Sequence, residues 1–343
     1  MPREPRIAVV GLGNWGKNVV RSFAGRRNCT LSYICDIDPG TLQTYRRLYP
    51  GAQPTTSYET VLNDANIDAV ALSTPAPDHF EMAYAALLAG KHVYVEKPMA
   101  LSVSDAERLV DCADTRGLKL MVGHLLEYHP AVEFMKEQID SGALGTIHYM
   151  YSQRLNLGVV RQAENAFWCL APHDISVALY LFGMEPDGVT ANGECYLQPG
   201  IEDVVFANLH FPDGRTANIH VSWLDPSKER KMVVVGSDKM LVFDDMQAAE
   251  KIRIYDKGAT IQTTDIGAAA AISVRHGNIL IPHISNKEPL DLETQHFVDC
   301  ILNDVRPRSD GHDGLRVVRI LEEVDRQLQA SRAAATTCSA KVS

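Results

Sequence analysis

The sequence lacks the features of a secreted or membrane-embedded protein. Its seven cysteines are odd in number and include no C-x-x-C pair, which favours a reduced intracellular chain over a disulfide framework. No apolar run is long enough to span a bilayer, and the N-terminus has no signal h-region. We therefore expect a cytoplasmic protein.

Basic segments are also missing. The formal net charge is -10, and no block of Lys and Arg offsets it. This balance argues against nucleic acid and anionic membrane surfaces as main partners. An anionic small molecule would therefore have to be bound by local positive groups.

Two kinds of catalytic motif are absent. The twelve histidines form no H-x-x-x-H or H-E-x-x-H pattern and the cysteines are scattered, so we expect no metal site. There is no G-x-S-x-G elbow, which argues against a Ser/His/Asp hydrolase.

The length indicates two domains. At roughly 150 residues per domain, 343 residues suggest two units, and a hydrophobic content of 45% lets each bury a core. We divide the chain into a first domain at 1–124, a second domain at 125–330 and a frayed tail at 331–343.

A glycine-rich turn follows the first predicted strand, residues 7–10, and opens a helix over 17–23. Gly11, Gly13 and Gly16 match the spacing G-x-G-x-x-G, with Asn14 and Trp15 between them. The three glycines suit a tight turn, close approach to a pyrophosphate and helix-on-strand packing. The helix N-terminus adds amides and a positive dipole end for phosphates.

An acid follows the second predicted strand, residues 31–35, about 20 residues further along. Asp36 stands there, where a carboxylate would hold the ribose hydroxyls of NAD and repel the 2′-phosphate of NADP. We therefore predict NAD as the cofactor. The alternative is a turn or helix-cap aspartate.

Further strands and helices complete an α/β domain with a doubly wound parallel sheet. A strand at 69–73 leads into Thr74 and Pro75, and a helix at 80–88 follows. This loop is expected to line the cofactor. His79 either caps or packs against that helix or contacts the cofactor.

The next strand, residues 92–95, ends in Glu96, Lys97 and Pro98. Ligands in open parallel sheets gather at the carboxyl ends of strands, so we expect Lys97 to face the ligand crevice. Pro98 favours an extended conformation at Lys97 or a cis bond, either of which would aim the amine. The alternative is a solvated lysine at a strand end.

Strands dominate the second half, where several segments alternate apolar with polar residues. We expect an open, mostly antiparallel sheet with helices packed on one face. The other face suits contacts between copies, so we expect a homodimer or homotetramer. The predicted strands are 147–154, 188–196, 203–211, 215–223, 230–236 and 239–243; a last helix is predicted at 314–329.

These motifs, in this order, resemble those of the glucose-fructose oxidoreductase / inositol dehydrogenase / MocA (Gfo/Idh/MocA) family. The likeness covers nearly the whole chain, and the E-K-P run after a G-K-H-V turn is its most specific part. It implies a Rossmann domain followed by an α/β domain with a large antiparallel sheet. It also implies that Lys97 acts at the carbon that exchanges hydride with the nicotinamide.

The run 165–176 resembles the family's D-x-x-x-H signature, whose carboxylate and imidazole meet the lysine across the substrate. His173 matches, but the aspartate position holds Cys169. A thiol cannot hold the lysine's proton by charge, so the amine should lose it more readily. Either Asp174 or a water covers the lost role, or activity is weakened.

Within the family the chain is most similar to nucleotide-sugar 3-dehydrogenases, which oxidise UDP-linked N-acetylhexosamines. This resemblance implies substrate contacts from Arg154, Asn156, His173, Lys228 and Arg230, of which the cations suit phosphate oxygens. The predicted cofactor contacts are Gly11, Gly13, Asn14, Trp15, Gly16, Asp36, Thr74, Pro75, His79, Glu96, Lys97 and Trp168.

We therefore expect NAD-dependent oxidation of a secondary hydroxyl, with Lys97 as proton acceptor and C3 of a UDP-N-acetylglucosamine-type sugar as the reacting carbon. One alternative substrate is an inositol or another free or phosphorylated sugar. The other alternative is an NAD-binding regulatory subunit with little catalysis, suggested by Cys169 and the open sheet.

Overall fold

The computed structural model describes residues 3–262 and 271–339. These residues form two compact units, each described separately below. The first contains residues up to His129 together with Lys287–Arg319, and the second contains Pro130–Asn286 and the residues from Ile320 onward.

A six-stranded parallel sheet forms the centre of the first unit, in the order β3-β2-β1-β4-β5-β6. The chain winds outward from β1 in one direction and from β4 in the other, so the β1/β4 boundary is the switch point where such sheets bind ligands. The strands are β1 (Arg6–Val10), β2 (Thr30–Cys35), β3 (Gln53–Thr55), β4 (Ala69–Leu72), β5 (His92–Val95) and β6 (Leu120–Val122).

The inner strands are apolar along their whole length. All four residues of β4 are buried, as are the last four of β1, which is typical of a parallel sheet covered on both faces. Pro54 is tolerated in β3 because that strand lies at the sheet edge. The helices are α1 (Gly16–Ala24), α2 (Pro39–Leu48), α3 (Tyr58–Asn63), α4 (Ala76–Leu88), α5 (Val103–Arg116), η1 (Leu125–Tyr128) and α9 (Pro289–Asn303).

Helix α9 returns the chain to the first unit after the second has been built. It packs on α1: the Ser22 hydroxyl lies 2.7 Å from that of Thr294, and Arg26 pairs with Asp291 at 2.9 Å. Its Phe297 belongs to the same hydrophobic core as Phe23. The domain boundaries predicted from the sequence placed all of 125–330 in the second domain. They therefore did not anticipate that α9 belongs to the first unit.

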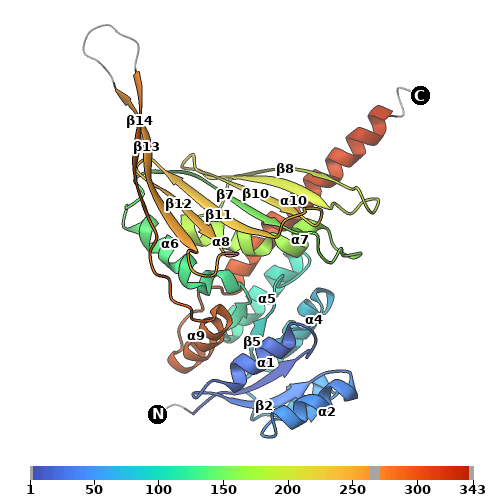
Figure 1. Ribbon diagram of the computed structural model, residues 1–343. Coiled ribbons are helices and arrows are strands. Elements are labelled where there is room, and N and C mark those ends of the chain that lie inside the picture. Colours follow the sequence, from blue (N-terminus) through green and yellow to red (C-terminus); the bar gives the residue numbers. More distant parts are fainter. Residues whose placement is uncertain (1–2, 263–270, 340–343) are drawn as a thin grey trace. The chain divides into compact units, whose positions relative to one another are not determined.

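The second unit contains an eight-stranded sheet, in the order β14-β13-β12-β11-β7-β10-β9-β8 (Figure 1). Every pair is antiparallel except β7 with β10. The strands are β7 (Ile147–Leu155), β8 (Gly188–Glu194), β9 (Val204–His210), β10 (Thr216–Ser222), β11 (Glu229–Gly236), β12 (Met240–Asp244), β13 (Ile252–Gln262) and β14 (Ala271–Leu280).

Helices cover one face of this sheet (Figure 1). Strand β9 shows the resulting alternation, since Val205, Ala207 and Leu209 are buried whereas Phe206 is exposed. The helices are α6 (Pro130–Asp140), α7 (Ala166–Leu170), α8 (Pro172–Phe182) and α10 (Gly311–Ser339), of which α10 begins in the first unit.

The predicted fold class is confirmed, because a parallel Rossmann sheet is followed by a large, mostly antiparallel one. Residues 331–339, part of the predicted frayed tail, continue helix α10. Within this stretch the run 333–335 is alanine, the residue with the highest helix propensity. Residues 340–343 lie outside the described residues.

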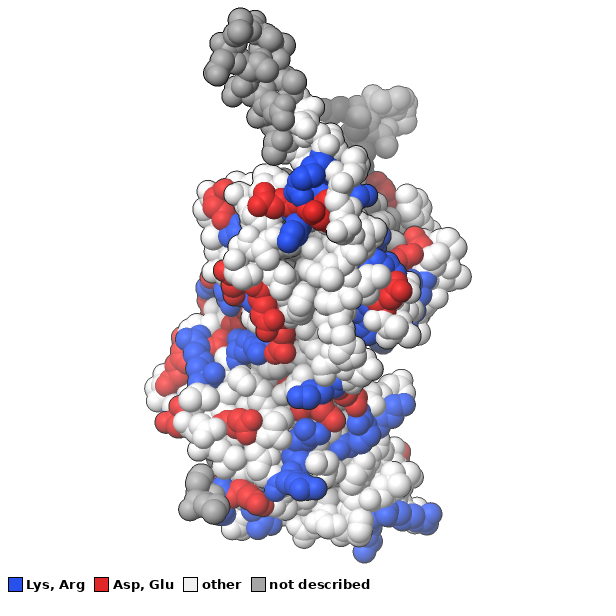
Figure 2. Space-filling model, turned by 60° about the vertical axis from the view of Figure 1, so that its left-hand side comes forward, with Lys and Arg blue, Asp and Glu red and all other residues white. Residues whose placement is uncertain are grey.

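No helix within the described ranges is long and apolar enough to cross a membrane. On the face drawn in Figure 2, basic and acidic side chains both occur, with broad areas of uncharged residues between them.

Candidate active site

The glycine-rich loop after β1 is packed tightly against its neighbours. Gly11 has a φ of 85°, and its amide donates a hydrogen bond to the Cys35 carbonyl over 2.9 Å. A β-carbon on Gly16 would lie 1.9 Å from the Gly11 carbonyl oxygen. Gly11 is therefore required by its backbone conformation and Gly16 by close packing.

Gly13 has a different environment. A β-carbon there would meet no heavy atom within 4 Å, and the residue is exposed just before α1. Open space beside backbone amides, at the positive end of a helix dipole, fits a pyrophosphate. The loop therefore provides the cradle that a dinucleotide needs and that a side chain would fill.

Asp36 follows β2 and is bonded to the glycine loop. One carboxylate oxygen accepts from the Leu12 amide over 2.7 Å, and the other accepts from the Asp38 amide over 2.9 Å. The cap of α2 is Asp38, which accepts from the amides of Gly40 and Thr41. The helix-cap role is thus excluded for Asp36, the turn contact is present, and the ribose contact stays a prediction.

His79 connects the loops after β4 and β5. Its ring nitrogens lie 2.8 Å from the Pro98 carbonyl oxygen and 2.9 Å from the Thr74 carbonyl oxygen, and the side chain is buried. Burial lowers the pKa of His79, although both carbonyls oppose this shift. His79 lies inside the first turns of α4, which begins after Pro75, so it has the packing role rather than the cap role.

Glu96 and Lys97 follow β5, which is two strands from β1 in the sheet. The Lys97–Pro98 peptide bond is cis. Glu96 Oε1 accepts from the indole N–H of Trp15 over 2.5 Å and lies 3.2 Å from the Tyr94 hydroxyl. The side chain of Trp15 therefore connects the glycine loop to the loop that carries Lys97.

Four loops predicted to act together do lie at one edge of the first unit. The glycine loop, Asp36, Thr74 and Lys97 each follow the carboxyl end of a strand in the run β2-β1-β4-β5. Asn14 is exposed in the same glycine loop. This edge can hold a dinucleotide and place an amine next to it.

In the second unit, Cys169 near the end of α7 and His173 at the start of α8 are four residues apart and half-buried. The neighbouring Asp174 is buried and accepts two hydrogen bonds from Arg154, over 2.5 and 3.4 Å. Because Arg154 already neutralises Asp174, this carboxylate is poorly suited to replace the one that Cys169 lacks.

The predicted substrate residues of the sheet lie close together. Arg230 is paired with Arg154 in the register of β11 with β7, and it donates to Asn156 Oδ1 over 2.6 Å and to the Leu155 carbonyl over 2.8 Å. Burial, and then the charge of Arg154, lower the pKa of Arg230. Lys228 is exposed in the turn before β11, apart from these hydrogen bonds.

Trp168 belongs to the interior of the second unit. It is 7% exposed, and its side chain hydrogen-bonds to Asp325 of α10. This position leaves the indole little surface for the cofactor contact that the sequence predicted.

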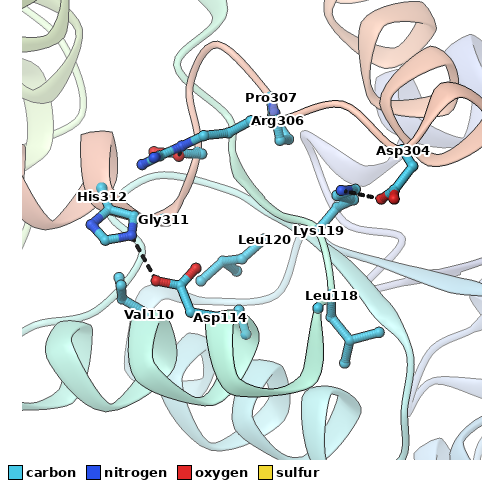
Figure 3. A pocket seen from close by; sticks show the side chains of 13 residues that line it. Val110, Asp114, Leu118, Lys119, Leu120, Asp304, Arg306, Pro307, Gly311 and His312 are labelled. Atoms are coloured by element: carbon cyan, nitrogen blue, oxygen red, sulfur yellow. Dashed lines mark hydrogen bonds and ion pairs between the residues drawn. The ribbon is translucent and has the colours of Figure 1, made fainter.

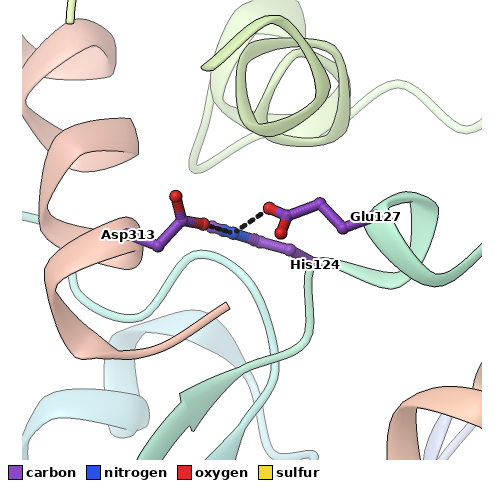
Figure 4. Close-up of side chains that lie close together, drawn as sticks. All are labelled: His124, Glu127 and Asp313. Atoms are coloured by element: carbon purple, nitrogen blue, oxygen red, sulfur yellow. Dashed lines mark hydrogen bonds and ion pairs between the residues drawn. The ribbon is translucent and has the colours of Figure 1, made fainter. Parts of the chain in front are cut away.

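One buried cluster of the first unit has the residue types of a metal site. His124 Nδ1 lies 2.8 Å from Asp313 Oδ2 and 3.4 Å from Glu127 Oε1 (Figure 4). Burial alone would lower the pKa of His124, but the hydrogen bonds to both carboxyls raise it to about 10. The three groups therefore pair with one another in this structure, and a metal could bind here only if His124 lost its proton.

A separate pocket of about 400 Å³ lies between the segment from the end of α5 to the start of β6 and the segment 304–312 (Figure 3). It is at the amino end of β6, whereas the loops described above follow carboxyl ends. Its charged groups are paired, with Lys119 2.6 Å from Asp304 and His312 2.8 Å from Asp114. The pocket therefore offers a charged ligand little unneutralised charge.

Comparison with known families agrees with this architecture. Residues 5–124 match an oxidoreductase family with an NAD-binding Rossmann fold, and residues 132–242 match the Gfo/Idh/MocA C-terminal domain. The chain belongs to the Gfo/Idh/MocA oxidoreductase family. This member therefore carries an NAD-binding Rossmann domain, and the predictions of family, cofactor and enzyme class are confirmed.

Relatives in the family differ in their substrates. The chain is 26% identical to the scyllo-inositol 2-dehydrogenase (NAD(+)) of Bacillus subtilis over 90% of this chain and 89% of the relative. It is 28% identical to the UDP-N-acetylglucosamine 3-dehydrogenase of Acidithiobacillus ferrooxidans over 74% and 76%. A solved structure of a UDP-N-acetylglucosamine 3-dehydrogenase from that organism has the same fold, with a TM-score of 0.79, 24% identity and coverage of 95% and 98%.

Tyr94 and Glu293, which lie behind the loop of Lys97, were not predicted to support it. Glu293 lies on α9, a helix that the sequence analysis did not predict, and its Oε2 is 3.0 Å from the Tyr94 hydroxyl. A periodic apolar pattern including Leu290 and Phe297 could have identified the helix. Its contact with Tyr94 had no signal in the sequence.

Proposed function

We propose that this protein oxidises a secondary hydroxyl of a sugar, with NAD⁺ as hydride acceptor and Lys97 as proton acceptor. The observation that carries the proposal is the shared edge of adjacent parallel strands, which gathers the glycine loop, Asp36 and Lys97. An amine at this edge suits removal of a hydroxyl proton, because ligands in such sheets bind beyond the strand ends.

The reaction divides into a hydride and a proton. Bound NAD⁺ supplies the hydride acceptor. The hydroxyl proton passes to Lys97 Nζ as the C–H bond breaks, and the alcohol becomes a ketone. Asp36 holds the ribose, while Trp15, through Glu96, and His79, through Pro98, hold the lysine's loop.

For the substrate we propose a nucleotide sugar such as UDP-N-acetylglucosamine, oxidised at C3. The named relative from Acidithiobacillus ferrooxidans supports this choice. So does the grouping of Arg154, Asn156 and Arg230, because a guanidinium donates well to phosphate oxygens. His173 would contribute an imidazole to the same substrate.

Two other candidates have their own support. An inositol or another free or phosphorylated sugar is supported by the scyllo-inositol relative, whose match covers more of this chain. A regulatory NAD-binding subunit is supported by Cys169, a thiol at the family's carboxylate position.

A homodimer or homotetramer also remains our proposal. It is supported by Tyr149 and Phe206, large side chains that are exposed on the open face of the sheet. Such exposed apolar surface is typical of contacts between subunits.

The proposal is tested with wild-type protein and two variants of one residue. A panel of UDP-sugars, inositols and free and phosphorylated hexoses is followed by absorbance of the reduced nicotinamide. Lys97→Ala should lower kcat by a factor on the order of 10² or more while NADH still binds. Lys97→Arg should lose a similar factor, because arginine keeps the charge but does not give up its proton.

Three outcomes decide between the candidates. Turnover of a UDP-sugar alone supports the nucleotide-sugar proposal, and turnover of inositols alone overturns it. Normal NADH binding without turnover of any compound favours the regulatory subunit. Retained kcat in Lys97→Ala removes Lys97 from the mechanism.

A further inference from the structure

A buried carboxyl lies behind the lysine's loop, two side chains away from the backbone of Lys97. Glu293 on α9 is 0% exposed, and its Oε2 lies 3.0 Å from the Tyr94 hydroxyl oxygen. The same hydroxyl lies 3.2 Å from Glu96 Oε1. The Tyr94 hydroxyl therefore stands between two carboxyl groups, one of which directly precedes Lys97.

Counting hydrogens fixes the protonation of this group. A tyrosine hydroxyl has one hydrogen to donate, and an ionised carboxylate can only accept. If Glu96 and Glu293 were both ionised, one of the two short contacts of Tyr94 would bring two oxygens together with no hydrogen between them. Two hydrogen bonds to Tyr94 therefore require that one of the carboxyls carries a proton and donates it.

The surroundings decide which carboxyl that is. Burial raises the pKa of Glu96, but the Trp15 indole N–H, the positive charge of Lys97 and the Lys97 backbone amide all oppose this shift and favour the ionised form. Glu293 Oε1 is buried, and none of the described residues hydrogen-bonds to it. Burying an oxygen that accepts no hydrogen bond costs much less free energy in a neutral carboxylic acid than in a charged carboxylate. The proton therefore belongs to Glu293.

The charges around Glu293 agree with this assignment. Burial, and then the negative charge of Glu96, raise its pKa well above the usual range. The neighbouring α1 offers Arg21 and Arg26, but these pair with Glu288, the N-cap of α9, and with Asp291 in its first turn. The titratable groups that face Glu293 from β5 and from the segment after β6 are Tyr94, Glu96, His124, Glu127 and Tyr128.

The parts of this arrangement are held rigidly. The Tyr94 ring packs edge-on against Phe23 and Phe297, with centroids 6.0 and 5.9 Å away. A β-carbon on Gly123 would lie 2.9 Å from Glu96 Oε2, so the glycine leaves just enough room for this carboxylate. The hydrogen-bonded groups thus have little freedom to exchange partners.

We propose that Glu293 is a proton-carrying positioning residue, which donates to Tyr94 so that Tyr94 donates to an ionised Glu96 next to Lys97. The hydrogen bonds then run in one direction, from Glu293 through Tyr94 to Glu96, and Trp15 donates to the same Glu96 oxygen as Tyr94. The neutral acid holds the carboxylate in place without adding a second negative charge beside the lysine. This inference rests on the proposed role of Lys97.

Infrared difference spectroscopy tests the proton directly and needs no enzymatic activity. A protonated carboxyl has a carbonyl stretch that a carboxylate lacks. Subtracting the spectrum of Glu293→Gln from that of the wild type at neutral pH should leave this band. The difference spectrum between wild type and Glu127→Gln is the control, because it identifies any band that comes from Glu127, another buried acid with a raised pKa. No band assignable to Glu293 would overturn the proposal.

Kinetics test the coupling to Lys97. In Glu293→Gln the amide can still donate to Tyr94, so kcat should stay within about twofold of wild type and the acid limb of the kcat/KM profile should not move. In Tyr94→Phe, Glu96 loses a donor and binds a proton more readily. We expect kcat to fall on the order of tenfold and the acid limb to move to lower pH.

The infrared and kinetic experiments can contradict the proposal independently of each other. An acid limb that moves in Glu293→Gln, or that stays unchanged in Tyr94→Phe, would refute the positioning role even if the enzyme is active. If no sugar is oxidised, the proposed function fails, and the infrared band still decides whether Glu293 carries the proton. NADH binding and thermal melting show whether each variant is folded.

Discussion

Two glycines of one loop should respond to the same substitution in opposite ways. A methyl group on Gly16 would lie 1.9 Å from the Gly11 carbonyl oxygen and 2.8 Å from its carbon, and these are backbone atoms that cannot turn aside. A methyl group on Gly13 would meet nothing within 4 Å. Gly16→Ala should therefore destabilise the fold, whereas Gly13→Ala should affect only the ligand.

The magnitudes follow from this contrast. Forcing an extra methyl into a packed site costs about 1–3 kcal/mol, and for a domain of this size each kcal/mol lowers Tm by about 2–4 °C. Gly16→Ala should thus melt about 4–8 °C below wild type for a cost near 2 kcal/mol. Gly13→Ala should stay within about 0.5 kcal/mol in stability, but its NADH Kd should rise on the order of tenfold, because the methyl occupies the path of the pyrophosphate.

Thermal melting without cofactor and NADH titration by fluorescence measure the two effects separately. An equal loss of Tm in both variants would show that the space at Gly13 is not open. Unchanged NADH affinity in Gly13→Ala would show that the loop does not hold the pyrophosphate.

Two further predictions concern charge. Hydrogen bonding to Asp313 and Glu127 raises the folded-state pKa of His124 to about 10, so its contribution to stability is complete below pH 6.5 and is lost as pH rises to 10; Tm should fall over this window. Burial and the charge of Asp313 raise the pKa of Glu127 to about 8, so Glu127 also contributes to the loss of stability as the pH rises. His124→Gln should therefore flatten the fall of Tm at alkaline pH. If Tm fell as steeply in that variant as in the wild type, the role of His124 would be contradicted. Asp36→Ser should raise the KM for NAD⁺ on the order of tenfold and reduce the preference over NADP⁺. The α2 cap variant Asp38→Ser should leave the preference unchanged; equal effects in both variants would argue against a ribose contact.

Much of the fold could be predicted because its signals are local. The uninterrupted apolar run of β4 indicates a strand buried on both faces, and the alternation in β9 indicates one buried face. Cofactor motifs were predictable for the same reason, since a turn, a helix start and a strand end each depend on neighbouring residues. Gly11 and Asp36 lie where the pattern placed them.

Other strands and helices had a sequence pattern that was overlooked or was interrupted by a polar residue. Strand β13 begins with Ile252 and Ile254 in alternation, yet β13 and β14 were not predicted. Helix α9 has Pro289 in its first turn and an apolar pattern interrupted by Glu293, a carboxyl at a fully buried position. An ionisable residue in such a stripe is read as a surface residue unless its partner is known.

The sequence by itself determined the two sheets in outline, the family, the dinucleotide loop and the lysine at the end of β5, because each depends on residues close together in the chain. Only the tertiary structure decided which groups support that lysine. Tyr94 and Glu293 are 199 positions apart, and the protonation of Glu293 follows from one hydroxyl hydrogen standing between two carboxyls. This assignment of the proton depends on distances between residues far apart in the chain, which no local pattern of residues encodes.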